Sequence, residues 1–244
     1  MLGGALYQLA ELDEAEQVLR DAERDARTSQ DVEVLTEIRN CQGLVRYGRG
    51  DYEQALTLQR QAVETGEQCG NTWGAGNART CCAVTLAAAG RLDEAAEYGR
   101  GGLASARAAG DAFRQIYALY ALGGIARIQG RPDEGIAGLR EGAELAARHH
   151  YSAFEVFHVL EETFCHLAAD RPRDAVLTGE RCLELARTKG WLFAEARVLR
   201  LIGTALAALG ERERAREHLT RAVTLLEPLR PPEAAEARAV LDTL

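Results

Sequence analysis

The strongest constraint on this chain is a small residue that recurs at a fixed interval of 40 residues. It is the last residue of short related segments such as Leu12–Ala15 and Leu92–Ala95. The six small residues are Ala15, Ala55, Ala95, Gly135, Ala175 and Ala215. An interval kept without insertion over this length is typical of a solenoid, in which each repeat buries its apolar face only against its neighbours. We therefore look for function on a repeated surface rather than in a single pocket.

Two further small positions keep the same interval and predict helical hairpins. Seven residues after the first set stand Ala22, Ala62, Gly102, Gly142, Cys182 and Ala222; twelve residues before it stand Gly3, Gly43, Ala83, Gly123, Thr163 and Gly203. Turn residues precede each of the first set by five, namely Ala10, Gly50, Gly90, Gly130, Asp170 and Gly210. Pro132 and Pro172 then fit the first position of a helix, where a missing N–H costs least. The residues Asp31, Asn71 and Asp111 are suited to cap the helices that open each hairpin.

The three small positions resemble the tetratricopeptide repeat, which has Leu-Gly in its first helix, Ala twelve residues later and a second Ala seven beyond that. Leu2-Gly3, Leu122-Gly123 and Ile202-Gly203 carry this pattern. The usual repeat has about 34 residues, so the added residues lengthen both helices. HEAT repeats also suit a period near 40 but do not demand the three small positions. The resemblance implies an all-α, right-handed superhelix of antiparallel helical hairpins. The six expected repeats span about 1–30, 31–70, 71–110, 111–150, 151–190 and 191–230.

The two ends of the chain carry separate expectations. Pro231-Pro232 stands where a seventh repeat would open, and residues 233–244 keep Ala234, Ala237 and Val240 on one helical face. We expect 231–244 to be a helix that covers the last apolar surface. Met1 falls well inside the expected first helix of repeat one. The hypothesis is that the chain is the C-terminal part of a longer protein, or that the uncapped first repeat forms a homodimer.

The segment 215–222, followed by Pro232-Glu233-Ala234, is similar to the C-terminal repeats of actinobacterial antibiotic-pathway regulators and signal-transducing ATPase regulators. In those proteins a DNA-binding and nucleotide-binding portion precedes the repeats. This resemblance implies a sensing or interaction module of a bacterial transcriptional regulator or signalling protein.

Composition excludes several function classes. The net charge of −8 argues against direct nucleic-acid binding and against anionic membranes, and no apolar run is long enough to span a bilayer. The six cysteines form neither a Cys-x-x-Cys pair nor a disulfide framework, so we expect a reducing, cytoplasmic location. Lys189 is the only lysine, and Gly-Trp follows it, which rules out a phosphate-binding loop. We expect no enzyme, no cofactor and no metal.

One constellation invites a metal interpretation. His158, Glu162 and His166 are spaced i, i+4 and i+8, so they share one helix face that a metal could use. The repeat pattern instead places Glu162 and His166 toward the core, where they would satisfy each other because an unpaired buried charge is costly. Added zinc would distinguish the two, since only a metal site predicts a rise in melting temperature.

The resemblance implies that the first helix of each repeat lines a concave groove. The residues it places there are Glu37, Asn40, Tyr47, Asn77, Tyr117, Tyr120, Arg127, Phe157, Phe164, Arg197 and Arg200. Asn40 and Asn77 can both donate and accept hydrogen bonds, as an extended peptide backbone requires. The aromatic residues are of the kind enriched at binding hot spots, and the arginines suit carboxylates. Three arginines against one glutamate give this face a charge of +2 and favour an acidic protein or peptide as partner.

Structural alternatives remain at several of these positions. The phenylalanines can pack between adjacent repeats, and Arg197 and Arg200 can pair with Glu195 or solvent. Trp73, Phe113 and Phe193 recur on the first turn of three first helices; they either pack on the preceding hairpin or widen the groove. The alternative functions are a self-associating structural module and a small-molecule sensor that uses the aromatic part of the groove.

Overall fold

The structure, a computed structural model, describes residues 9–228 and 230–244, and over these residues the chain is helical without strands. Twelve helices fall in this described part. They are α1 (Leu9–Ser29), α2 (Val32–Gly48), α3 (Tyr52–Cys69), α4 (Thr72–Ala88), α5 (Leu92–Ala108), α6 (Ala112–Ile128), α7 (Pro132–Arg148), α8 (Ser152–Ala168), α9 (Pro172–Thr188), α10 (Leu192–Ala208), α11 (Arg212–Leu226) and α12 (Pro231–Leu241). None of them is both long and apolar enough to cross a membrane.

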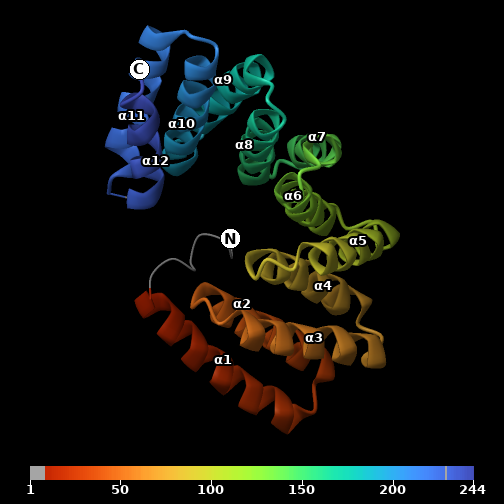
Figure 1. The fold of residues 1–244 in the computed structure, drawn as a ribbon. Coiled ribbons are helices and arrows are strands. Elements are labelled where there is room, and N and C mark those ends of the chain that lie inside the picture. The colour runs from red at the N-terminus through yellow and green to blue at the C-terminus, as the bar shows by residue number, and fades with distance from the viewer. Residues whose placement is uncertain (1–8, 229) are drawn as a thin grey trace. The chain divides into compact units, whose positions relative to one another are not determined.

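The chain forms two compact units, an N-terminal unit of residues 1–122 and a C-terminal unit of residues 123–244, with the boundary inside α6. Within each unit, helices that follow one another in sequence pack as antiparallel hairpins, as α2 with α3 and α10 with α11 do (Figure 1). First helices also contact the next first helix, as α2 contacts α4 and α8 contacts α10. Each unit therefore presents one face built from first helices and another built from second helices.

The helix starts keep the interval seen in the sequence. First helices begin at Val32, Thr72, Ala112, Ser152 and Leu192, and second helices at Tyr52, Leu92, Pro132, Pro172 and Arg212. The Asp31 carboxylate caps α2 by accepting from the Val34 amide at 3.0 Å, and the Asn71 side chain caps α4 through the Gly74 amide at 2.8 Å. Most hairpin turns end on a glycine with left-handed backbone, such as Gly90 at φ 77°. Local capping and turn chemistry thus set the length of every hairpin.

The small positions are contact points between helices, as the spacing predicts. Ala55, Ala95, Ala175 and Ala215 are completely buried. At Gly203 of α10, an added Cβ would lie 2.6 Å from Cγ of Leu219 in α11, which is closer than real Cβ atoms approach. The backbones of paired helices therefore approach so closely that only a small residue fits between them.

The C-terminal helix and the start of the described chain compare differently with the sequence-based expectations. α12 buries Ala234 and Ala237 against α10 and α11, so it does cover the last hairpin. At the other end, Ala10 lies within α1 rather than in a turn, because α1 already runs from Leu9. The expected first helix of repeat one, including Gly3, lies outside the described residues. The same holds for any dimer contact that this helix would make.

Candidate binding faces of the first helices

The starts of α2, α4 and α6 carry a row of exposed apolar side chains. Val34, Trp73 and Phe113 are all exposed, and the Trp73 side chain retains 47% of its accessible surface. Polar residues accompany them: Glu37 on α2 and Asn77 on α4 lie about one turn further along, and Arg114 on α6 directly follows Phe113. We call these six residues the tryptophan strip. An exposed apolar row with a polar border is typical of a surface that contacts another protein.

Trp73 is held in place by groups from α6. Its indole Nε1 donates to Oδ2 of Asp111 at 3.0 Å, and the Arg114 guanidinium lies over its ring, 5.4 Å from the centroid. Arg114 also donates to the Trp73 carbonyl and to Asp111, each at 3.0 Å. We call Asp111 and Arg114 the Asp111–Arg114 clamp. Arg114 is only 3% exposed, so these contacts with Trp73 are part of the packed structure. Holding the indole in this way reduces the entropy that a binding partner must overcome.

Glu37 connects α2 with α4 on the same strip. Burial raises the pKa of its carboxyl group, although a hydrogen bond with Asn77 and the charge of Arg114 act in the opposite direction. The carboxylate packs so closely on α4 that a Cβ added to Gly74 would lie 2.5 Å from its Oε1. The strip is therefore continuous from α2 through α4 to α6.

Asn40 differs from its expected place in an open groove. It is only 2% exposed, because α4 packs over it, and its side chain hydrogen-bonds Cys81. Burial raises the pKa of the Cys81 thiol to about 12 in spite of this bond. Burial also raises the pKa of Tyr117, whose phenol lies close to Cys81. Asn40 therefore belongs to the core between α2 and α4, and a peptide could reach it only after side chains move.

The two other tyrosines expected in the groove remain partly exposed. Tyr47 lies near the end of α2, with its ring centroid 5.8 Å from that of Tyr52. Tyr120 lies on α6 in the N-terminal unit. Both thus retain surface on the N-terminal unit, together with Asn77.

In the C-terminal unit, three guanidinium groups surround the ring of Phe164. Arg127, Arg197 and Arg200 lie 5.2, 5.1 and 5.5 Å from its centroid. These residues come from α6, α10 and α8, which are far apart in sequence. We call them the arginine cluster. The structure does bring together four of the residues that the sequence placed in the groove.

Each arginine of this cluster lies beside a carboxylate. Arg127 donates to Glu161 at 2.7 Å, Arg197 donates to Glu233 at 2.8 Å, and Arg200 lies 3.0 Å from Glu236. Burial lowers the pKa of Arg200. Glu195, the partner considered from sequence, instead accepts from Arg187 at 3.0 Å. Three carboxylates thus balance three arginines, because α12 adds two glutamates that no first helix contains.

Phe157 packs against an aromatic neighbour rather than standing open. Its ring meets Trp191 edge to face at 5.5 Å and Phe154 at 6.4 Å. Trp191 in turn packs on the apolar core of the C-terminal unit. This arrangement matches the structural alternative for Phe157, while its partly exposed surface still borders the first-helix face.

Glu162 and His166 lie together in the core, as the repeat pattern predicts. Oε1 of Glu162 is 3.5 Å from Nε2 of His166 and accepts a 2.6 Å hydrogen bond from Nε of Arg140. His158 points elsewhere, with its Nδ1 2.7 Å from the Phe154 carbonyl. In the described part of the chain, no group of three or more His, Cys, Asp or Glu side chains is placed to hold a metal ion.

Comparison with known proteins identifies the fold. No family model and no curated protein matches the sequence. Among solved structures, the chain is similar to BtubC (BKLC) from P. vanneervenii, with a TM-score of 0.76, 17% identity, and coverage of 89% of this chain and 90% of that one. A putative kinesin light chain from Podosopora anserina, described as having nearly identical TPR-like repeats, gives a TM-score of 0.64, 16% identity, and coverage of 79% and 95%. The fold is that of the tetratricopeptide-like repeat proteins.

Two further tetratricopeptide-like neighbours have titles that mention binding or sensing. YrrB, described as a TPR protein with an unusual peptide-binding site, has a TM-score of 0.55, 16% identity, and coverage of 91% of this chain and 97% of that one. The apo quorum sensor NprR from B. thuringiensis has a TM-score of 0.68, 12% identity, and coverage of 95% and 62%. At sequence identities this low, the similarity shows a shared fold and no more.

Sequence reasoning missed two groups of residues on these faces. The Asp111–Arg114 clamp was hidden because its partner Trp73 lies 38 positions earlier, although an aspartate three residues before an arginine at a helix start was a usable signal. Glu233 and Glu236 were assigned to a covering helix, and their i, i+3 spacing on one face of α12 was the signal that they would reach a neighbour.

Proposed function

We propose that this chain is a non-catalytic scaffold that binds a protein or peptide segment on its first-helix faces. The observation that carries the proposal is the tryptophan strip, in which Trp73 is exposed yet held in one position by Asp111 and Arg114. Tryptophan and arginine dominate binding energy at protein interfaces. Val34 and Phe113 extend the apolar contact on either side.

The polar residues Glu37 and Asn77 of the strip would fix the orientation of a bound peptide through hydrogen bonds. Asn77 can donate to and accept from a peptide backbone, and the Glu37 carboxylate accepts backbone N–H groups. A segment that lays apolar side chains on Trp73 and hydrogen-bonds Glu37 and Asn77 would satisfy both kinds of group. This division between an apolar anchor and polar positioning groups is common in peptide recognition.

The arginine cluster supports an acidic residue in the partner. The guanidinium groups are already held around Phe164, and Glu236, which pairs with Arg200, is itself exposed. A partner carboxylate can replace Glu236 at a small cost, since exposed ion pairs contribute little. An acidic side chain is therefore the substituent that we expect the C-terminal unit to select.

The comparisons support a binding role, because one neighbour is described by its peptide-binding site and another as a quorum sensor. Together with the resemblance of residues 215–222 to bacterial regulators, they support a regulatory context. We propose that the chain is the sensing or interaction module of a transcriptional regulator or signalling protein. Finding a DNA-binding or nucleotide-binding segment encoded in frame upstream would support this context. Finding only an unrelated gene upstream would argue against it.

The binding proposal is tested by selection from a displayed random peptide library on the full chain. We expect one group of selected peptides to be apolar and to bind the Trp73→Ala variant at least about tenfold more weakly, which corresponds to about 1.4 kcal/mol, and a second group to be acidic and to bind the C-terminal unit. Arg197→Gln should weaken the acidic peptides by about 1–3 kcal/mol. Affinity is measured by calorimetry with synthetic peptides.

The matched control is Val18→Ala, which removes another exposed apolar side chain, on α1 and outside the strip. This variant should bind every selected peptide as the wild type does. If no peptide is enriched, or if Trp73→Ala binds as tightly as Val18→Ala, the proposed function is wrong.

A further inference from the structure

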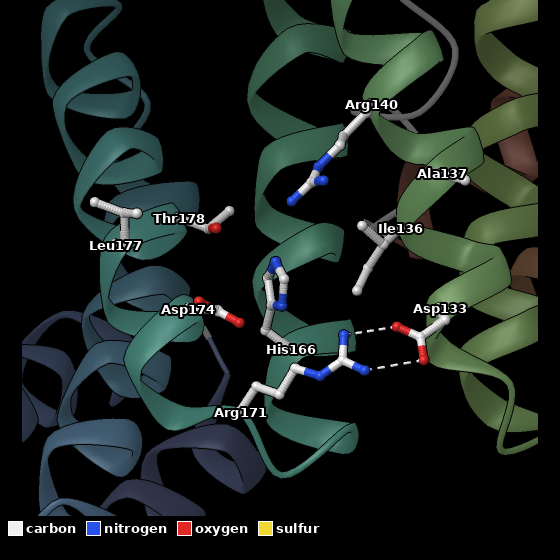
Figure 2. Close-up of a pocket in the computed structure, with 9 residues that line it drawn as sticks. All are labelled: Asp133, Ile136, Ala137, Arg140, His166, Arg171, Asp174, Leu177 and Thr178. Carbon is white, nitrogen blue, oxygen red and sulfur yellow. Dashed lines mark hydrogen bonds and ion pairs between the residues drawn. The ribbon is translucent and has the colours of Figure 1, made fainter.

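A cavity of about 440 Å³ opens between two second helices of the C-terminal unit, α7 and α9, with the end of α8 beneath them (Figure 2). This volume lies in the range of small-molecule sites. Its walls come from α7 and α9, so it is separate from the first-helix faces described above. Nine residues line it: Asp133, Ile136, Ala137, Arg140, His166, Arg171, Asp174, Leu177 and Thr178.

The floor of the cavity is polar, whereas the equivalent positions of most other first helices are apolar. Counted at the interval of 40, the position of His166 is occupied by Arg46, Leu86, Ala126 and Leu206 in α2, α4, α6 and α10. The position of its partner Glu162 is occupied by Gln42, Cys82, Leu122 and Ile202 in the same helices. Burying an imidazole and a carboxylate here costs free energy that aliphatic residues avoid. In α2 the equivalent polar residues are hydrogen-bonded to α1, Gln42 to Glu23 and Arg46 to Glu16, whereas the ring nitrogens of His166 in α8 have no hydrogen-bond partner in the described structure.

His166 lies at the centre of the cavity with bonding capacity unused. It is only 4% exposed, and its Nδ1 has no hydrogen-bond partner in the described structure. In Figure 2 its ring points into the space between the helices. Buried polar atoms are nearly always hydrogen-bonded, so a buried imidazole nitrogen that faces a cavity indicates a bound group there.

Two opposite charges face this space from different helices. Arg140 of α7 donates from Nε to Glu162 at 2.6 Å, and the rest of its side chain, which is 59% exposed, is open to solvent and to a ligand. Asp174 and Thr178 of α9 line the same space, where Asp174 is exposed and interacts electrostatically with Arg171. Arg171 does not compete for a ligand, because it binds Asp133 through two bonds of 2.6 and 3.0 Å (Figure 2).

This charge arrangement disfavours a simple anion. Two guanidinium groups, Arg140 and Arg171, are matched by three carboxylates, those of Asp133, Glu162 and Asp174. A ligand with one carboxylate and one ammonium group satisfies both the fork of Arg140 and the charge of Asp174. Ile136, Ala137 and Leu177 supply aliphatic surface beside these groups.

We propose that this cavity is a binding site for a small zwitterion of the free amino acid or dipeptide class. The ligand carboxylate accepts two hydrogen bonds from Arg140, its ammonium group donates to Asp174, and a polar group on its side chain bonds His166. The aliphatic residues contact the rest of the ligand. Such a site would give the repeat chain a metabolite-responsive element on the second-helix side.

The test uses the full chain in a thermal-shift screen of common amino acids and dipeptides, followed by calorimetry of those that stabilise it. We expect at least one to bind, and its N-acetylated or amidated form to bind at least about tenfold more weakly because one charged contact is lost. Asp174→Asn should weaken the free ligand by a similar factor. Which member of the panel binds distinguishes a free amino acid from a dipeptide.

The matched control is Glu134→Gln, which removes a carboxylate from the first turn of α7 at the position that corresponds to Asp174 but does not line the cavity. It should leave affinity unchanged. In the wild type, ligand binding should shift the NMR ring signals of His166 and leave those of His218 in place. The proposal is overturned if no member of the panel binds, if Asp174→Asn and Glu134→Gln behave alike, or if zinc chloride alone stabilises the chain through His166.

Discussion

At the scale of single residues, the fold depends on small side chains that receive larger ones. Gly142 of α7 is the sharpest example, because an added Cβ would lie 2.2 Å from Nε2 of His158 in α8. His158 is completely buried, and its other ring nitrogen is bonded to the Phe154 carbonyl at 2.7 Å, so the ring has little freedom to retreat. The contact leaves room for hydrogen alone.

We therefore expect Gly142→Ala to lower the free energy of unfolding by about 1–3 kcal/mol, since overpacking forces the backbone or the imidazole to shift. Gly124→Ala in α6 is the control, because a Cβ there meets only Glu161 at an ordinary 3.4 Å. It should stabilise the chain by up to about 1 kcal/mol through helix propensity. Urea unfolding of both variants is the measurement, and equal effects would contradict this account of the small positions.

At the scale of helices, capping residues set where each element starts, and one cap has an additional role. Asp111 caps α6 by accepting from the Arg114 amide at 2.9 Å, and it also accepts from the Arg114 side chain and from Trp73 of α4. Burial alone would raise the pKa of Asp111, but these hydrogen bonds hold it below its usual value of 3.8. The cap of one helix thus orders the exposed tryptophan of another.

A lowered folded-state pKa means that the Asp111 carboxylate stabilises the fold above its usual pKa and that this contribution is lost as the pH falls through the lowered value. Asp111→Asn should reduce the free energy of unfolding by about 1–3 kcal/mol at pH 7, because a charge-assisted bond to Arg114 is lost. The difference from wild type should shrink below pH 3.8. Urea titrations across this pH range provide the measurement.

Asp31→Asn serves as the comparison, since Asp31 caps α2 through the Val34 amide alone. Asparagine is as good a cap as aspartate, so this change should cost only a few tenths of a kcal/mol. A loss at Asp31 as large as that at Asp111 would show that capping by charge, rather than the link to α4, accounts for the effect.

At the scale of the whole molecule, stability follows from contacts between neighbouring helices. Among the described helices, α1 contacts only α2, whereas α4 contacts α2, α3 and α5, and α10 contacts α8, α9, α11 and α12. In repeat proteins, stability is close to a sum of such neighbour contacts. Helix α1, at the end of the described chain, therefore has fewer interactions that oppose its local unfolding.

We expect backbone amides of α1 to exchange with deuterium at least about tenfold faster than those of α4 and α10, since end helices open without unfolding the rest. Exchange of the full chain, followed by mass spectrometry of its peptides, measures this difference. Equal protection in α1, α4 and α10 would instead indicate a single cooperative unfolding unit.

Most helix boundaries and the pairing of helices into hairpins could be predicted from short-range signals in the sequence. The interval of 40, the turn glycines, Pro132 and Pro172 and the caps at Asp31 and Asn71 act over a few residues, so their consequences are readable without coordinates. The arrangement of the small positions identified the type of repeat for the same reason, because a close approach of two backbones demands a small side chain wherever it occurs.

Which polar groups remain available for binding could not be predicted in the same way, because it depends on how distant segments pack. Asn40 was expected in an open groove but is covered by α4, and two of the three arginines expected to attract an acidic partner, Arg197 and Arg200, already face glutamates from α12. The cavity at His166 needs three helices to form it. Burial and ion pairing depend on neighbours brought together from distant parts of the chain, and spacing along one helix does not contain that information.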